Sequence, residues 1–592
     1  MQRMRPLLPM LVVAAVLGAW LGLRAFAAQH RLEQARGSLT TARVALVDRR
    51  VDDARAAIEA AIRDTSRARR LTGDPVWRVA AAVPLLGRSL QSVRGIAAAV
   101  DDVARQVVPP GLRAAEVLAG PELRTDDGAI DLGLVEGITP MVAQSGSRLR
   151  AVRDRLAGLP ALGVVGPVRA EQRALGTQLA DLSVAIDRAG QVAALAPPLL
   201  GADRPRRYFV LVQQPGESRG TGGLPGGYAI VEVDQGRVRV TASGSNRDLK
   251  SGDIPVPAGV SEEYAYEYGG NLAFRLWSNV NLSPDLPVVA KVVAARWKAQ
   301  GGQDVDGVIV VDPTSIADLL RGSDPVDVGG GKLVAPKNMV RFLTVDQYVG
   351  IASVESDQTE RKDALAGAAQ QAASRLSSGA DDTGQTLAGL TAAVTSGHLR
   401  MASDDPALQP GLAAVGIDGA LPRGEAPVAY AVVENASQGK LDSFLERHVT
   451  YTAGPCTGDI RASTIAVQLR NRAPARGLPP YLTNRDDDGV PRQSLDSAVL
   501  LQTYGSPGAV LQAAELNGTP VPQLDTSDDG TGLHEGLEAG LPFWSLYVNL
   551  PRDVPQVLTL HLEEPVVAGA PRLPEQPLVL ALRRTVDAPI CS

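Results

Sequence analysis

The sequence has few of the residues on which metal and redox centres depend. Its 592 residues include only 2 cysteines and 5 histidines, and aromatic residues make up 4% of the chain. No CxxC, HxH or HxxxH spacing occurs, which argues against a zinc site or a thiol redox site. The glycine-rich segments lack the GK[ST] ending of a nucleotide-binding P-loop. A net charge of -6 argues against nucleic acid binding, which would need a basic stripe.

Long apolar runs are also scarce, and the one that stands out lies at the N-terminus. Arg3 and Arg5 precede an uncharged run from Leu7 to Leu23. As a helix this run would rise about 25 Å, the lower limit for crossing a bilayer core. The flanking arginines predict a cytoplasmic N-terminus and an extracytoplasmic remainder. We therefore expect residues 1–28 to be a single-pass membrane anchor; the alternative is a cleaved signal peptide, because residues 25–27 read Ala-Phe-Ala.

The two cysteines fit an exported chain. Cys456 and Cys591 both lie in the C-terminal part of the sequence. Disulfides form and persist in oxidising compartments, so we predict a bond between them. The alternative is two unrelated buried thiols.

The rest of the chain predicts a multidomain α+β protein. Residues 29–204 have helical periodicity, with leucines seven residues apart between 32 and 46, and favour a coiled coil over residues 30–72 that could also support a homo-oligomer. Strands alternate with helices over 205–375, which predicts an α/β/α domain. Residues 376–424 are expected to be a helical linker. Beyond 425, alternating segments such as 463–470 and 557–564 predict a β-sandwich over 425–592.

A glycine-rich segment within residues 213–227 is the most unusual part of the central region. Glycines at 220, 222, 223, 226 and 227 follow Arg219 and precede a strand. Bare backbone of this kind can converge its N–H groups on an anion, with Arg219 adding a bidentate fork. It can equally form a tight turn that needs positive φ. A second cluster, SEEYAYEYGG at 261–270, combines aromatic and acidic residues that suit a sugar contact or an ordinary loop.

The central segments resemble a bacterial family known as domain of unknown function 4012. The resemblance is carried by DPVWRVAAAVPLLG, QQPGESRGTGGLPGGYAIVEVDQGRV, NLSPDLPVVAKVV and DVDGVIVVDPTSIADLLRGSDPVDV. It is densest from 205 to 350. This family implies no established activity.

The order of elements also resembles the LytR-CpsA-Psr ligases, which transfer glycopolymers from polyprenyl-phosphate carriers to the cell wall. That resemblance implies that Arg219, Arg247, Asp248 and Arg361 occupy motif positions. The glycine-rich segment would place the backbone of Gly222 and Gly223 beside the same anion. It further implies Mg²⁺ held by Asp248, with Asp253 as a second candidate. The aspartate expected soon after Arg219 is missing, because Gly220 and Thr221 stand there.

Two hypotheses about function follow from these resemblances. The first is a membrane-anchored, extracytoplasmic protein of the cell envelope that binds a polyprenyl-phosphate-linked glycan, or a similar anionic lipid, without turnover. The second is a glycopolymer phosphotransferase that acts on polyprenyl-diphosphate-linked glycans with a modified metal site. The missing aspartate favours binding over transfer, so whether the chain is an enzyme stays open.

Overall fold

The chain forms two compact units. The computed structural model describes residues 7–47, 50–83, 87–160, 163–329, 331–349, 359–378, 383–485, 494–524 and 532–591. The first unit, which we call the helical unit, comprises Met1–Thr125 and Ile130–Pro197. The second, which we call the mixed unit, comprises Asp126–Ala129 and Pro198–Ser592. The α+β, multidomain class expected from the sequence is confirmed.

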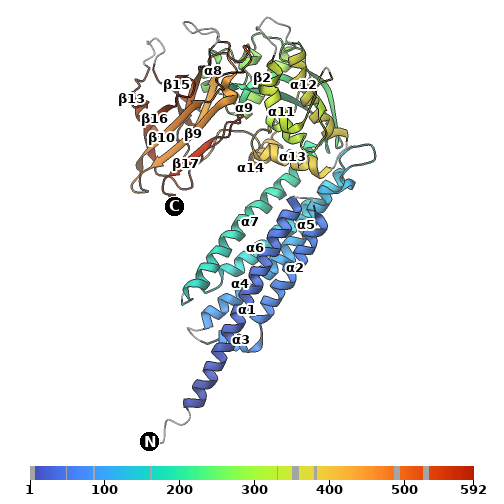
Figure 1. Ribbon diagram of the computed structural model, residues 1–592, viewed down its shortest axis with the longest axis vertical. Coiled ribbons are helices and arrows are strands. Elements are labelled where there is room, and N and C mark those ends of the chain that lie inside the picture. Colours follow the sequence, from blue (N-terminus) through green and yellow to red (C-terminus); the bar gives the residue numbers. More distant parts are fainter. Residues whose placement is uncertain are drawn as a thin grey trace. The chain divides into compact units, whose positions relative to one another are not determined.

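The described helices of the helical unit lie side by side as a bundle (Figure 1). Their cores meet through apolar residues such as Ile96, Leu149 and Leu179. The bounds are α1 (Leu7–Val47), α2 (Val51–Leu71), α3 (Pro75–Ala81), α4 (Gly87–Asp102), η1 (Val103–Val107), α5 (Val108–Ala119), η2 (Pro121–Leu123), α6 (Leu132–Ala157) and α7 (Gly166–Leu199).

The coiled coil expected over residues 30–72 is two helices that pack on each other. Helix α1 ends at Val47 and α2 begins at Val51. The alanines between the periodic leucines, Ala35 and Ala42, are buried, as is Ala61 on α2. Small side chains allow two helices to approach closely. The start of α3 is capped, because the Asp74 side chain accepts a hydrogen bond from the Trp77 N–H at 2.9 Å.

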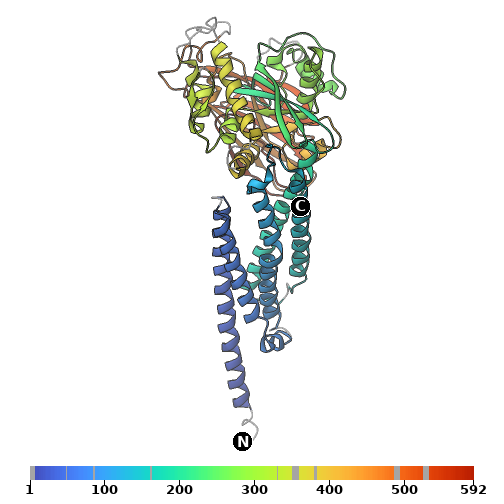
Figure 2. The ribbon, with the colours of Figure 1, turned by 90° about the vertical axis from the view of Figure 1, so that its right-hand side faces the viewer.

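The expected membrane anchor is not supported. Among the residues that the structure describes, no helix is both long enough and apolar enough to cross a bilayer. Residues 7–23 are the first part of α1, which continues unbroken into a segment with many charged residues. The N-terminal part of α1 extends beyond the other helices of its bundle in both views (Figure 1, Figure 2).

The mixed unit begins with a five-stranded sheet in the order β3-β2-β1-β4-β7. Strand β1 pairs antiparallel with β2 and parallel with β4. The strands are β1 (Arg206–Arg219), β2 (Gly222–Asp234), β3 (Arg237–Ser245), β4 (Gly307–Val311) and β7 (Arg400–Ala402), with β5 (Val326–Asp327) and β6 (Leu333–Val334) forming a separate pair. Residues 400–402 were expected to lie in a helical linker, but they form the edge strand of this sheet.

Helices cover both faces of the five-stranded sheet (Figure 2). On one face Phe209 and Leu211 pack with α8 and α9; on the other, Val212 packs with α10, α11 and α12. The bounds are α8 (Glu262–Gly269), η3 (Trp277–Asn279), α9 (Leu286–Ala299), α10 (Pro313–Leu319), η4 (Pro336–Asn338), α11 (Met339–Thr344), η5 (Asp346–Tyr348), α12 (Thr359–Ser378), α13 (Thr383–Thr395) and α14 (Gln409–Val415).

The C-terminal part of the mixed unit is a sandwich of two sheets around one core. A six-stranded sheet (β13-β12-β16-β10-β9-β17) packs on a four-stranded sheet (β14-β15-β11-β8). Ile465 and Leu560 are buried between them, as the alternation predicted. The bounds are β8 (Tyr430–Asn435), η6 (Leu441–Phe444), β9 (Leu445–Ala453), β10 (Ile460–Asn471), β11 (Ser497–Tyr504), β12 (Val510–Leu516), β13 (Thr519–Pro520), β14 (His534–Glu538), β15 (Leu541–Leu550), β16 (Gln556–Pro565) and β17 (Arg583–Asp587).

A disulfide closes the sandwich. It joins Cys456 to Cys591 with a Cα–Cα distance of 5.5 Å, which is the pairing that the sequence analysis expected. The bond ties the C-terminal end of the chain to the segment between β9 and β10.

Candidate functional site

The glycines that follow Arg219 lie against the chain's own backbone. A Cβ on Gly220 would stand 1.9 Å from the Leu282 carbonyl oxygen, and one on Gly223 would stand 2.3 Å from the Gln214 carbonyl carbon. Gly222 also has a φ of +138°, which side chains rarely adopt. The bare backbone therefore serves the close packing of the β1–β2 hairpin, and the contacts of Gly220 and Gly223 leave no room there for an anion.

Arg219 is already engaged with backbone carbonyl groups. Its guanidinium donates to the Ser218 oxygen at 2.9 Å, the Ser278 oxygen at 3.2 Å and the Asn435 oxygen at 3.3 Å. Its own carbonyl accepts from the Gln576 side chain at 2.8 Å. Arg219 thus ties the end of β1 to β8 of the sandwich.

Among the described side chains, neither Arg247 nor Asp248 forms a hydrogen bond or an ion pair with Arg219. Arg247 and Asp248 are exposed, and the Asp248 carboxylate accepts from the Ser245 N–H at 2.8 Å. Arg361 lies in the first turn of α12, and its side chain is outside the described residues. Asp253 is exposed, and its Oδ1 atom lies 4.0 Å from the Nε atom of Arg275. Across the described part of the chain, no group of three or more His, Cys, Asp or Glu residues could hold a metal ion.

Residues 216–220 read GESRG, which has the GxSxG spacing of a serine nucleophile. In the structure Ser218 lies within β1 rather than at a strand-to-helix turn. It is fully buried, and its hydroxyl donates to Asp442 at 2.7 Å. A nucleophile must be exposed to its substrate, so this serine has a structural role.

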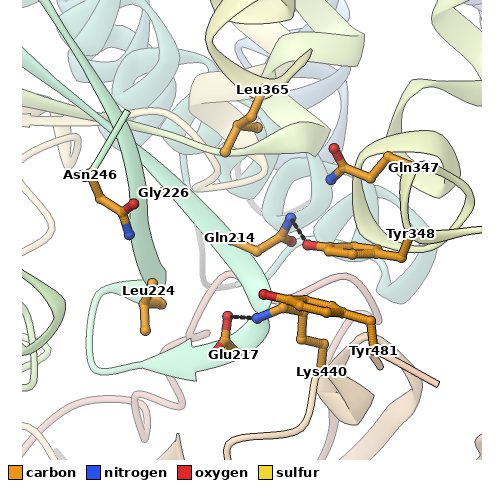
Figure 3. Close-up of a pocket in the computed structure, with 10 residues that line it drawn as sticks. All are labelled: Gln214, Glu217, Leu224, Gly226, Asn246, Gln347, Tyr348, Leu365, Lys440 and Tyr481. Carbon is orange, nitrogen blue, oxygen red and sulfur yellow. Dashed lines mark hydrogen bonds and ion pairs between the residues drawn. The ribbon is translucent and has the colours of Figure 1, made fainter. Parts of the chain in front are cut away.

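A cavity of about 170 Å³ lies beside the β1–β2 hairpin (Figure 3), and we call it the hairpin cavity. It is formed by the hairpin, η5, α12 and the segments before η6 and after β10. Its lining residues are Gln214, Glu217, Leu224, Gly226, Asn246, Gln347, Tyr348, Leu365, Lys440 and Tyr481. Two of the lining residues are linked to the candidate residues from the sequence. Gly226 belongs to the glycine-rich segment, and Asn246 directly precedes Arg247.

An ion pair between two lining residues lies in the hairpin cavity. Lys440 pairs with Glu217, and its ammonium stands 5.2 Å from the ring centre of Tyr481. Burial opposes the charge of Lys440, but Glu217, Tyr348 and Tyr481 outweigh burial and raise the pKa of the ammonium. The lysine is therefore charged and already neutralised by the protein.

Amide and phenol groups complete the hairpin cavity. The Gln214 amide donates to the Leu343 carbonyl at 2.8 Å and to the Tyr348 hydroxyl at 3.3 Å. The rings of Tyr348 and Tyr481 stack with centres 5.2 Å apart, and their hydroxyl ends point toward Gln214 and Lys440 (Figure 3). The Gln347 amide donates to the Leu343 carbonyl, while its buried Oε1 accepts no hydrogen bond from the residues that the structure describes.

This arrangement suits a neutral ligand with many hydroxyl groups. The charges of Lys440 and Glu217 cancel, whereas binding of a phosphate would need a cation without a partner. Amides and phenols both donate and accept hydrogen bonds, as sugar hydroxyls do. Leu224 and Leu365 add apolar surface. Sequence reasoning missed Lys440 and Tyr481 because they lie more than 200 residues beyond Gln214, and no local pattern connects them.

Residues 203–348 match the model of a family described as Protein of unknown function (DUF4012). The match covers the five-stranded sheet except β7 and supports the first resemblance drawn from the sequence. No curated protein and no solved structure matches the chain. The comparisons give no support for a likeness to the LytR-CpsA-Psr ligases.

Proposed function

We propose that the mixed unit is a glycan-binding module that acts outside the cytoplasm and holds one sugar residue in the hairpin cavity. The observation that carries the proposal is a cavity with a neutralised ion pair, two phenols and three amides, one of which has a buried oxygen without a donor. A sugar hydroxyl would supply the missing donor to Gln347.

The disulfide supports an oxidising compartment, because such bonds are rare in cytosolic proteins. The proposal concerns binding without turnover. A polyprenyl-phosphate-linked glycan would present a suitable sugar, but its phosphate would lie outside the hairpin cavity.

The test is binding of uncharged and phosphate-bearing bacterial envelope oligosaccharides to the full chain, first on a printed array and then by calorimetry. Gln347→Met and Tyr481→Phe each remove one neutral hydrogen-bonding group. Such bonds contribute about 0.5–1.5 kcal/mol each, so each variant should weaken binding about two- to tenfold. Gln468→Met, on an exposed position of β10, is the matched control.

We expect an uncharged oligosaccharide to bind and inorganic diphosphate not to compete with it. The proposal fails if no oligosaccharide binds, if diphosphate displaces the sugar, or if both cavity variants bind as well as the control. Arg247→Ala should have little effect on the sugar, whereas the ligase-like hypothesis expects a large loss.

A further inference from the structure

A second cavity, of about 300 Å³, lies between α8 and the outer face of the four-stranded sheet. We call it the α8 cavity. Helix α8 is formed by the aromatic and acidic cluster at 261–270, and it contributes Tyr266 and Glu267. The sheet contributes Glu434, Gln502 and His534. The hairpin cavity shares none of these residues.

The strand register explains why polar groups meet at the α8 cavity. Glu434 on β8 pairs with Leu500 on β11, and Gln502 on β11 pairs with Ser545 on β15. Because side chains alternate along a strand, these residues share one face of the sheet. Their neighbours Val433 and Leu501 point the other way, into the core of the sandwich.

Two buried oxygens in the α8 cavity lack hydrogen-bond donors. The exposed fraction is 7% for Glu434 and 4% for Gln502. The Oε1 atoms of both side chains are buried and accept no hydrogen bond from the described residues. An unsatisfied buried acceptor is costly, and most such atoms in proteins are paired. Both atoms belong to residues that line the same cavity, so one ligand with several donors could satisfy them.

The charges of the α8 cavity favour a cation as that ligand. Burial raises the pKa of Glu434 to about 8; Arg219 on β1 lowers it, and Glu538 on β14 raises it further. Glu267 at the rim lies 2.9 Å from the Nε2 atom of His534. An approaching cation would stabilise the ionised form of Glu434. The aromatic faces of Tyr266 and Phe543 add surfaces that attract cations.

We propose that the α8 cavity binds a primary ammonium group, which donates hydrogen bonds to Glu434 and Gln502. An ammonium carries three donors and no acceptor, so it matches two unpartnered acceptors and a carboxylate at the rim. A neutral hydroxyl would satisfy one acceptor but would leave the carboxyl of Glu434 uncompensated. The ammonium could belong to an amino sugar or to a simple amine.

The test uses probes that differ in one group. D-glucosamine and D-glucose share a ring and differ in an ammonium or a hydroxyl at carbon 2, and n-propylamine presents the ammonium without a sugar. Binding to the full chain is measured by calorimetry at pH 7 in phosphate and in MOPS, which have different heats of ionisation and contain no primary amine. We expect glucosamine and propylamine to bind. Propylamine is fully protonated at pH 7, so its binding should release protons as Glu434 ionises.

Variants assign the binding to particular residues. Glu434→Gln should weaken amine binding at least tenfold and abolish proton release. Gln502→Met should weaken it several-fold and keep the release. His534→Gln should also keep the release, which excludes that histidine as the source of the proton. The matched controls, Glu563→Gln and Gln468→Met, lie at exposed positions of β16 and β10 and should bind as wild type does.

The proposal is overturned if glucose binds as tightly as glucosamine, if no amine binds, or if amine binding releases no proton. Proton release on amine binding to the wild-type chain tests the proposal even if Glu434→Gln fails to fold. Variants of the hairpin cavity should leave amine binding unchanged, so failure at one cavity does not count against the other.

Discussion

The helical unit and the mixed unit handle buried charge differently. In the helical unit Asp101 and Asp102 are buried, but their partners Arg69, Arg105 and Arg155 are about half exposed. In the mixed unit both members of a pair can be buried, as in Arg461 and Glu564, which are 2% and 0% exposed. The first arrangement leaves charge at the surface of a bundle. The second removes it from water.

The mixed unit also shows two ways of burying a carboxyl group. Glu564 accepts hydrogen bonds from Arg461, Tyr451 and Ser506, so its charge is fully compensated. Glu434 has a buried oxygen that accepts no hydrogen bond from any described residue. A satisfied network stabilises a fold, whereas an unsatisfied group marks a position that a ligand can complete.

The largest expected effect concerns the disulfide, which lies in the mixed unit. The bond closes a loop across a sequence separation of 135 residues. In the chain-entropy model, closing such a loop stabilises the folded state by about 5 kcal/mol. Cys591→Ser should therefore lower the unfolding temperature of the mixed unit in calorimetry and leave the transition of the helical unit in place. Equal shifts of both transitions, or no shift, would contradict the prediction that the disulfide stabilises the mixed unit alone.

A smaller loss is expected from breaking the buried ion pair of the sandwich. Arg461→Met leaves Glu564 buried without its charge partner, which typically costs about 3–5 kcal/mol. The control is Arg36→Met, which breaks an exposed pair with Glu171 in the helical unit. Exposed pairs contribute about 1 kcal/mol or less. Urea unfolding followed by circular dichroism measures the free energy of unfolding of each variant. Equal losses in Arg461→Met and Arg36→Met would contradict the contrast between the two units.

Local features of the fold were predictable from the sequence. The cap formed by Asp74, the alternation around Ile465 and the turn at Gln235 and Gly236 each depend on a few neighbouring residues. Both turn residues have positive φ, at 48° and 77°. Strand β7 was missed because three residues are too few to show a period. Its pairing with β4 depends on tertiary contact.

The candidate sites were less predictable, for a physical reason. A glycine segment shows that something approaches the backbone, but it cannot show whether that neighbour is an anion or another part of the chain. Here the neighbours of Gly220 and Gly223 are carbonyl groups of residues 282 and 214. Likewise, Glu434 belongs to β8 (Tyr430–Asn435), which is buried almost throughout. The residues of β8 therefore do not alternate between polar and apolar in a way that would reveal α8 on the outer face of its sheet. Both sites depend on contacts between distant segments.

The last prediction concerns pH and tests the buried carboxyl groups whose pKa is raised. Burial raises the pKa of Glu434 to about 8, of Glu538 to about 7 and of Asp285 to about 6. Each folded pKa lies above the unfolded value, so the folded state binds more protons between roughly pH 4.5 and 8. The free energy of unfolding must then fall as the pH rises through this window. The mixed unit should be less stable at pH 8 than at pH 5.

Glu434→Gln should remove the largest part of that dependence. A shift of one pKa unit corresponds to about 1.4 kcal/mol, so we expect the variant to remove about 3–4 kcal/mol of the change between pH 5 and pH 8. Glu563→Gln, at an exposed position, should not alter the slope. The helical unit provides the contrast, because its buried carboxylates Asp101 and Asp102 are already paired with arginines. Urea unfolding at three pH values measures the slope for each unit. A mixed unit that gains stability from pH 5 to pH 8, or a slope that Glu434→Gln leaves unchanged, would mean that Glu434 is compensated in the folded state and that the α8 cavity needs no cation.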